Sequence, residues 1–500
     1  MQKIKFSFGK VLLLGIISLT GVQLSAQENV NHLSLQDVIY LARQQSPDAL
    51  IAKHRFRSSY WEFRTYKANY LPSLWANGTV PNFNRSIEPV TQPDGSIEYR
   101  ESKYTEISGQ LSLRQKIGLT GGEIFLSSGL RRNENIFPDT TTTSYLSTPV
   151  NIGYRQPVFQ YNEYRWDKKI EPMRFEEAKR TYLENREQIS INATNLFFNL
   201  LLAQVEMEIA LKNYANYDTL YNIALGRYQL GKIAENELLQ LELNLLRAEA
   251  AVDNAELSFE NNLFKMKSYL RIKDEESIKL IPPTNTYHFD VDIAEAVSEA
   301  KRNTSTGLAF ERRLIEAQSE VARARMNGRF DADIYAVFGL TQTGNELENA
   351  YESPLDQQQI RLGLTFPILD WGLARGQIKM AESNQELVRT SVEQDRIDFE
   401  QNIYLKVVRF NMQEKQLMIA AKSDTVAQKR FDVTQKRYMI GKVNDVLELN
   451  NAQIDNDSAK KGYFSALQNY WNSYYDLRKT SLYDFRKNER ITFNETDILQ

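Results

Sequence analysis

The feature that most constrains this chain is a short motif that occurs twice, 210 residues apart. Residues 227–232 read RYQLGK, and residues 437–442 read RYMIGK. Each copy is followed by an acidic, leucine-rich run, and the same offset relates Pro157 to Pro367. A match that holds one frame over this distance indicates that a single structural unit has been duplicated in tandem.

The duplication divides the chain into four parts. We expect a secretory signal peptide at residues 1–26, because basic residues precede a short apolar run that ends near a cleavable LSAQ. Repeat one covers about 31–281 and repeat two about 288–486, with IPPTN at 281–285 as the joint. Residues 487–500 remain as a C-terminal tail.

Each repeat is predicted to follow the same order of elements. Strands at about 70–159 and about 331–369 precede a very long helix, a tip turn at 231–236 or 441–444, and a returning helix. Pro172 either starts or kinks the long helix of repeat one, because proline disrupts helix interiors. The returning helix is about 52 Å long against about 88 Å for its partner. We expect 306–328 to fill this gap in repeat one and 48–69 to fill it in repeat two.

The predicted strands alternate between apolar and polar side chains. In QIRLGLTF, Ile360, Leu362 and Leu364 share one face, and Arg361 and Gly363 share the other. This pattern fits a β-barrel whose outer face meets lipid, and the alternative is a sheet half-buried on protein. Residues 106–130 read as an extra hairpin, which either joins the barrel or forms an external loop.

Composition argues against several classes of function. The chain has no cysteine and three scattered histidines, so we predict neither disulfides nor a metal site. The formal net charge is −3 without a basic tract, which argues against nucleic acid as a partner. GRYQLGKI resembles a phosphate-binding P-loop, but Ile233 stands where a hydroxyl is needed and a helix precedes it. We therefore predict that the protein is not an enzyme and needs no cofactor.

The order of these features resembles the TolC-type outer-membrane factor family, the outer membrane efflux proteins. The resemblance rests on LSLQDVIYLARQQSPDAL near the mature N-terminus, on YLPSL, on QPVFQY and FPILDWG, and on the two Tyr-x-x-Gly turns. It implies an α+β membrane protein that forms a homotrimer. A β-barrel with four or six strands per protomer would continue into a long periplasmic α-helical coiled-coil tunnel. The implied location is the outer membrane of a Gram-negative bacterium, with a large periplasmic part.

The function implied by the resemblance is the exit duct of a tripartite efflux system. Such a duct is a passive gated channel that touches outer-membrane lipid and docks on a periplasmic adaptor (membrane fusion) protein and an inner-membrane RND or ABC transporter. One alternative is the exit duct of a type I protein or peptide secretion system. Another, from a different class, is a non-conducting structural coiled-coil protein of the envelope.

The resemblance also assigns roles around the two Gly-Lys turns. The adaptor-docking tip would consist of Gly231, Lys232, Gly441 and Lys442. The gate network would consist of Tyr228, Tyr438 and Glu237, and the lumen constriction of Asp445 and Glu448. Helix capping explains the same turns without any partner, with Asn236 and Asn444 as N-caps of the returning helices. Repeat two departs from the family pattern, because its Gly441 and Asp445 are closer in sequence than Gly231 and Glu237.

Overall fold

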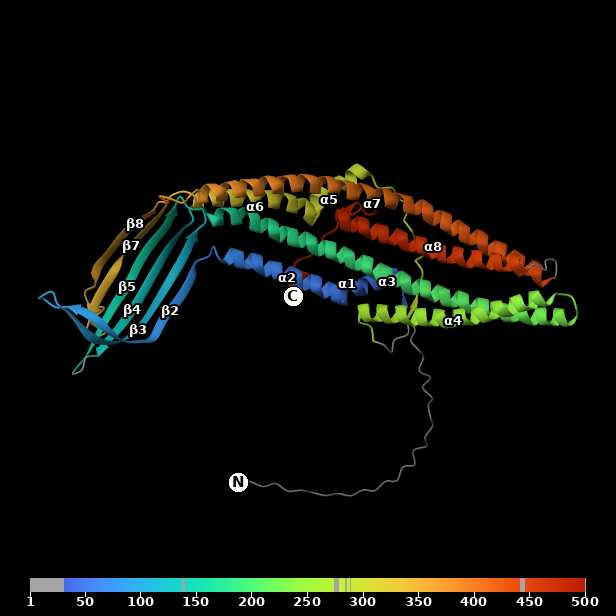
Figure 1. The fold of residues 1–500 in the computed structure, drawn as a ribbon, viewed down its shortest axis with the longest axis horizontal. Helices are drawn as coiled ribbons and strands as arrows, with labels where there is room; N and C mark the ends of the chain where they lie inside the picture. The colour runs from blue at the N-terminus through green and yellow to red at the C-terminus, as the bar shows by residue number, and fades with distance from the viewer. Residues whose placement is uncertain are drawn as a thin grey trace, which may run out of the picture.

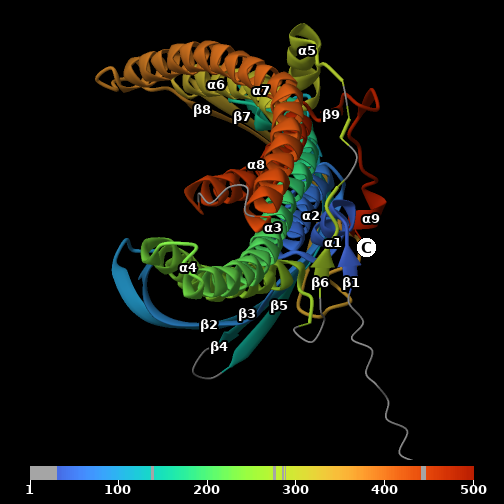
Figure 2. The ribbon, with the colours of Figure 1, turned by 90° about the vertical axis from the view of Figure 1, so that its right-hand side faces the viewer.

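The structure is a computed structural model, and it describes residues 31–136, 140–273, 278–283, 286–287, 289–440 and 446–499. The molecule is elongated, with a β-sheet at one end and a long layer of helices extending from it (Figure 1). Viewed along its length, the helices follow an arc (Figure 2). The predicted signal peptide at 1–26 lies outside the described residues.

Six antiparallel strands form the sheet, in the spatial order β2-β3-β4-β5-β7-β8. Their bounds are Ser73–Thr91 (β2), Ile97–Ile117 (β3), Gly122–Ile136 (β4), Thr141–Val158 (β5), Asp331–Gly344 (β7) and Leu355–Thr365 (β8). The hairpin predicted at 106–130 joins this sheet, because β3 and β4 pair along their length. Of the two predicted strand counts, the described chain therefore has the larger. In the described chain the outer strands β2 and β8 each pair on one side only.

One face of the sheet is apolar and uncovered in the single chain. In β8, Ile360, Leu362 and Leu364 point to the same side and are 73%, 62% and 54% exposed. Val80 in β2 is likewise exposed. Within the described chain, this face is therefore not packed on protein, contrary to the alternative of a half-buried sheet.

Two helices run from the sheet to the far end of the molecule, α3 (Glu163–Gln229) and α7 (Leu373–Met439). Each has 67 residues, which corresponds to about 100 Å. The side-chain oxygen of Asn162 caps α3 by accepting a hydrogen bond from the backbone N–H of Arg165 at 3.2 Å. Of the two alternatives for Pro172, the one in which it starts this helix is wrong, since Pro172 lies inside it.

Four shorter helices flank the two long ones. They are α2 (Pro47–Ala68), α4 (Glu235–Leu270), α6 (Ser305–Asn327) and α8 (Val446–Ser481). Figure 1 shows α2 and α4 following one another along α3, and α6 and α8 along α7. The prediction that 48–69 lies along the long helix of repeat two, α7, is wrong within one chain, because α2 lies along α3. The prediction for 306–328 holds in part, because α6 also contacts α3 through Arg312 and Glu177, 2.6 Å apart.

Short elements hold the chain ends against the middle of the molecule. β1 (Asn31–Leu33) pairs in parallel with β6 (Ile278–Leu280), and β9 (Tyr483–Asp484) pairs with β10 (Glu489–Arg490). The short helices are α1 (Leu35–Gln45), α5 (Ile293–Asn303) and α9 (Thr496–Leu499). Near the chain's end, the carbonyl oxygen of Ile498 accepts a hydrogen bond from Arg57 of α2 at 2.7 Å.

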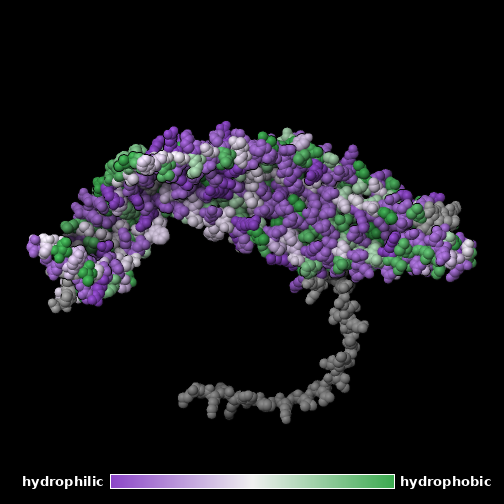
Figure 3. Space-filling view, in the orientation of Figure 1, coloured by the Kyte–Doolittle hydropathy of each residue, from purple (hydrophilic) through white to green (hydrophobic). Residues whose placement is uncertain are grey.

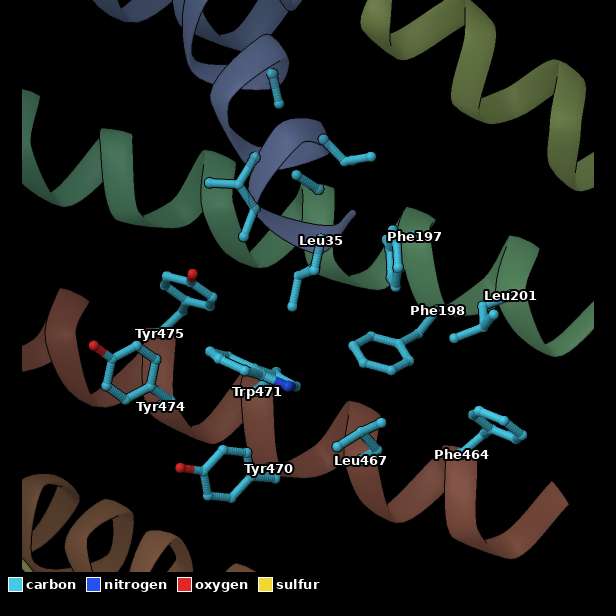
Figure 4. Packing of buried hydrophobic residues seen from close by; sticks show 14 of the residues in the cluster. Leu35, Phe197, Phe198, Leu201, Phe464, Leu467, Tyr470, Trp471, Tyr474 and Tyr475 are labelled. Atoms are coloured by element: carbon cyan, nitrogen blue, oxygen red, sulfur yellow. The ribbon is translucent and has the colours of Figure 1, made fainter. Parts of the chain in front are cut away.

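The main hydrophobic core lies at mid-length, where α1, α3, α7 and α8 meet. Figure 4 shows Phe197 and Phe198 of α3 beside Leu467 and Trp471 of α8, with Leu35 of α1 next to them. All five side chains are at most 3% exposed. This core fixes the long helices relative to one another at mid-length, and a second hydrophobic cluster joins them near their far ends.

Candidate functional site at the far end of the helices

The turn between α3 and α4 closes the far end of repeat one. The backbone N–H groups of Gly231 and Lys232 donate to the carbonyl oxygens of Tyr228 at 2.8 Å and Arg227 at 2.9 Å. This pair of bonds is a Schellman C-cap, which needs a left-handed residue after the helix. Gly231 supplies that conformation with φ = +65°. The backbone geometry of the turn is therefore enough to explain why a glycine occupies position 231.

The start of α4 differs from the prediction. Asn236 was expected to be the N-cap, but α4 begins at Glu235, and Ala234 occupies the cap position without a side-chain hydrogen bond. Glu235 and Glu237 lie in the first turn, where the helix dipole favours carboxylates. Lys232 is exposed in the turn.

The corresponding turn of repeat two is only partly described. Gly441, Lys442 and Asp445, and with them the turn at 441–444 and its expected N-cap Asn444, lie outside the described residues. Glu448 is described, in the first turn of α8, and is half-buried.

Tyr438 is the buried member of the predicted gate. Its side chain is 2% exposed and packs in a second hydrophobic cluster with Leu220 and Ala224 of α3. The guanidinium of Arg227 lies over the Tyr438 ring, 5.6 Å from its centroid. The same guanidinium donates through Nη2 to the carbonyl oxygen of Met439 at 3.2 Å. Arg227 thus joins the end of α3 to the end of α7.

The two tyrosines of the repeated motif lie in different environments. Tyr228 is 40% exposed, whereas Tyr438 is enclosed. Burial raises the pKa of Tyr438, Arg227 opposes this shift, and Glu237 reinforces it. The structure therefore brings Tyr438 and Glu237 into one electrostatic environment and leaves Tyr228 outside the cluster.

Sequence reasoning missed Arg227 as a member of this network. The signal for it was the Arg-Tyr pair that both motifs share. The arginine of the first motif interacts with the tyrosine of the second, so the contact crosses between the repeats rather than lying within one.

A seam of polar side chains also joins α3 to α8 beside this cluster. Tyr217 donates to Oδ1 of Asn450 at 2.9 Å, and Asn213 donates to Oδ2 of Asp457 at 2.7 Å. Gln453 in turn donates to Oδ1 of Asn213 at 2.7 Å. The signal that could have predicted this seam is the amide-rich stretch LNNAQIDND at 449–457. These polar contacts add to the hydrophobic cluster that Leu220 of α3 shares with Leu449 and Ala452 of α8.

The described contacts at this site are noncovalent. In the part of the chain that the structure describes, no three His, Cys, Asp or Glu side chains are placed to bind a metal ion. None of the described helices is long and apolar enough to cross a membrane. The site offers aromatic, guanidinium and amide contacts between helix ends, which can separate and re-form without a reaction.

Comparison with known proteins relates part of the chain to a known family. Residues 306–481, from α6 to the end of α8, match the family model described as "Outer membrane efflux protein". The resemblance to this family is confirmed. The matched segment contains Tyr438 and Glu448. Among curated proteins, none is significantly similar in sequence.

Several solved structures share the fold of the whole chain. The CmeC outer membrane channel of Campylobacter jejuni has a TM-score of 0.65 at 16% identity, covering 93% of this chain and 88% of that chain. The open-state MtrE outer membrane channel of Neisseria gonorrhoeae has a TM-score of 0.62 at 15% identity, covering 92% of this chain and 90% of that chain. The outer membrane protein VceC of Vibrio cholerae has a TM-score of 0.62 at 13% identity, covering 91% of this chain and 96% of that chain.

At these identities, the similarity concerns the fold. The predicted combination of helices and strands agrees with it. The predicted outer-membrane location agrees with the matched family model and with the names of all three proteins.

Proposed function

We propose that this chain is the outer-membrane exit channel of an efflux system, a passive and gated conduit that performs no chemistry of its own. One observation carries the proposal: an antiparallel sheet with an uncovered apolar face continues into helices of about 100 Å. The same arrangement covers 93% of this chain in the comparison with the CmeC channel.

Three copies would complete the conduit. The free edges of β2 and β8 expose unpaired backbone N–H and C=O groups, which a sheet in a membrane must satisfy. Pairing β8 of one copy with β2 of the next gives a closed barrel of about 18 strands. Continuing the arc of helices in Figure 2 around the same axis gives the periplasmic tunnel.

The far end of the helices would be both the docking surface and the gate. Gly231, Lys232, Gly441 and Lys442 would meet a periplasmic adaptor protein that links the channel to an inner-membrane RND or ABC transporter. Lys232 is exposed, and a Cβ placed on Gly231 would find no atom within 4 Å. The tip of repeat one is therefore free to be approached.

The gate is proposed to consist of Tyr228, Tyr438 and Glu237, with Arg227 as a further member. Asp445 and Glu448 would line the constriction. Three copies would place about six carboxylates around one axis, which favours cations and generates repulsion between like charges.

Conductance of the purified protein in planar bilayers tests this proposal. We expect cation-selective channels in the wild type. Because the carboxylates supply the selectivity, the double variant Asp445→Asn/Glu448→Gln should lose cation preference and become less sensitive to block by trivalent cations. Bilayers that stay closed under every condition would instead favour the non-conducting coiled-coil protein. Unchanged selectivity in the variant would reduce Glu448 to a residue that stabilises the start of α8.

A further inference from the structure

A cavity lies where the sheet meets the helices, at the opposite end of the helices from the proposed gate. Its volume is about 1100 Å³, and its walls come from the end of α2, the β3–β4 turn and the beginning of α3. α2 contributes the rings of Phe63 and Tyr66, and Tyr70 follows directly after it. Leu119 of the turn is 88% exposed at its edge. The wall is therefore largely apolar and aromatic.

All charged residues of the cavity wall are basic: they are Lys67, Arg165, Lys168 and Lys169. Neither Asp nor Glu is among its lining residues. Within the described ranges, none of the four cations forms an ion pair with a carboxylate. Two of them lie over aromatic rings instead, Lys67 at 4.5 Å from the Phe63 centroid and Lys169 at 5.2 Å from that of Trp166.

Helical spacing separates the charges of this segment. Arg165 and Lys169 are four residues apart in α3 and share the face toward the cavity, together with Lys168. Asp167 and Glu171 follow the same spacing on another face and do not line the cavity. The carboxylate of Glu171 is bound by Arg174 at 2.7 Å. The excess of positive charge thus belongs to the cavity and not to the whole segment.

The matching segment of the second repeat contains a carboxylate that pairs with one of its cations. By the offset of 210 residues, Glu382 stands in place of Pro172 and Ile378 in place of Lys168. Glu382 accepts from Lys379 at 2.8 Å and from Arg325 at 2.9 Å. In repeat two, Lys379 and Arg325 thus share a carboxylate of the chain, whereas the junction in repeat one leaves its cations available to an outside anion.

We propose that this cavity binds the anionic headgroup of a glycerophospholipid. The four cations would bind the phosphate and headgroup oxygens, and the acyl chains would lie along Leu119 and the aromatic rings. Aromatic and basic side chains together are typical of membrane boundaries, where one end of a group is apolar and the other is wet. This inference rests on the proposed function, because it places the sheet in the membrane and the helices outside it.

Lipid retention by the full-length protein tests the proposal. The protein is reconstituted in nanodiscs of equal phosphatidylglycerol and phosphatidylcholine, released, and its bound lipids are counted by native mass spectrometry. A basic side chain near an anionic headgroup strengthens binding about fivefold. We therefore expect the wild type to prefer phosphatidylglycerol, and Arg165→Gln/Lys168→Gln/Lys169→Gln to lose that preference at least about tenfold.

The matched control is Arg325→Gln/Lys379→Gln in repeat two, where both cations are paired with Glu382, and it should keep the wild-type preference. Equal retention of both lipids by the wild type would overturn the proposal. So would a preference that persists in the triple variant. Conductance measured on the same samples separates the two proposals: a silent wild type counts against the channel, and a conducting wild type without lipid preference counts against the lipid site.

Two further measurements exclude other occupants. Glycerol 3-phosphate should not displace phosphatidylglycerol, because it lacks acyl chains; effective displacement would show a site for soluble anions instead. The natural chain has no cysteine, so Leu119→Cys provides one labelling position. A water-soluble maleimide should label it in lipid-free detergent and fail to do so with phosphatidylglycerol present. Protection without lipid would show that a second copy of the chain covers the cavity, and would refute lipid binding there.

Discussion

Glu187 is a buried carboxylate shared by two arginines from opposite ends of the sequence. It is 1% exposed, and its oxygens lie 2.7 Å from Nη2 of Arg43 and 2.9 Å from Nε of Arg478. Burial lowers the pKa of Arg43, and Glu187 only partly offsets this. Burial would also lower the pKa of Arg478, but Glu187, Tyr474 and Asp484 outweigh it and raise that pKa. In the described chain, Arg478 is also paired with Asp484, whereas Glu187 is the one carboxylate paired with Arg43.

Replacing this carboxylate should destabilise the protein strongly. Glu187→Gln leaves two part-buried guanidinium groups short of negative charge, and removing one partner of a buried pair costs about 3–5 kcal/mol. Denaturant unfolding of the solubilised protein measures the decrease in its free energy of unfolding. Glu206→Gln is the control, because its ion pair with Lys461 at 3.0 Å is exposed, and such pairs contribute less than about 1 kcal/mol. Equal losses in the two variants would contradict the assigned role of Glu187.

Arg227 is the residue whose removal should loosen the gate. Arg227→Gln loses the contact with the Tyr438 ring, which contributes about 1 kcal/mol per copy. Because that contact joins the ends of α3 and α7, we expect a higher open probability in single-channel recordings. Arg437→Gln changes the same position of the second motif and should leave gating unaltered. A raised open probability in both variants would point to net charge at the tip instead of this contact.

At the scale of elements, the turn after α3 has two explanations that one substitution can separate. Asparagine tolerates the left-handed conformation, so Gly231→Asn should keep the Schellman cap and the stability of the wild type. It also adds a side chain to a surface that is open at Gly231. If an adaptor approaches this backbone closely, export in cells should fall while assembly persists.

Gly95 is the matched control for this turn. It lies in the β2–β3 turn at the other end of the molecule, with φ = +84° and no atom within 4 Å of an added Cβ. Gly95→Asn should therefore leave export intact. Export is measured by how much of a fluorescent efflux substrate the cells accumulate. Full export in Gly231→Asn would mean that Gly231 serves the helix end alone.

Sequence periodicity located most helices closely but could not determine which of them lie side by side. The ranges 48–69 and 306–328 became α2 and α6 with ends shifted by one residue. These helices have 22 and 23 residues, so length could not assign either to a long helix. The start of α3 was left open, because Pro172 could start the helix or kink it, and the cap is in fact at Asn162. In the site, Gly231 was predictable from its turn, whereas Arg227 was not, since its partner is in the other repeat.

At the scale of the whole molecule, the two repeats have diverged in complementary ways. The first contributes four strands of the sheet and the basic cavity, and the second contributes the remaining two strands and the buried Tyr438. The sequence predicted the duplication, but it left the number of strands open. The extra hairpin occurs in repeat one only, so repeat two offers no matching segment with which to compare it. The packing of β3 and β4 into the sheet is a tertiary contact that local alternation does not specify.

The orientation of the sheet in the membrane can be tested with two residues of β8. Leu362 and Gln359 point to opposite faces because they are three residues apart in a strand. A lysine on the lipid face near the bilayer centre costs about 2–4 kcal/mol, and it would be present in every copy. Leu362→Lys should therefore sharply reduce the folded protein recovered from outer membranes, as followed by heat-modifiable mobility in gels. Gln359→Lys should assemble normally, and the reverse result would place the polar face toward lipid and the apolar face toward the lumen.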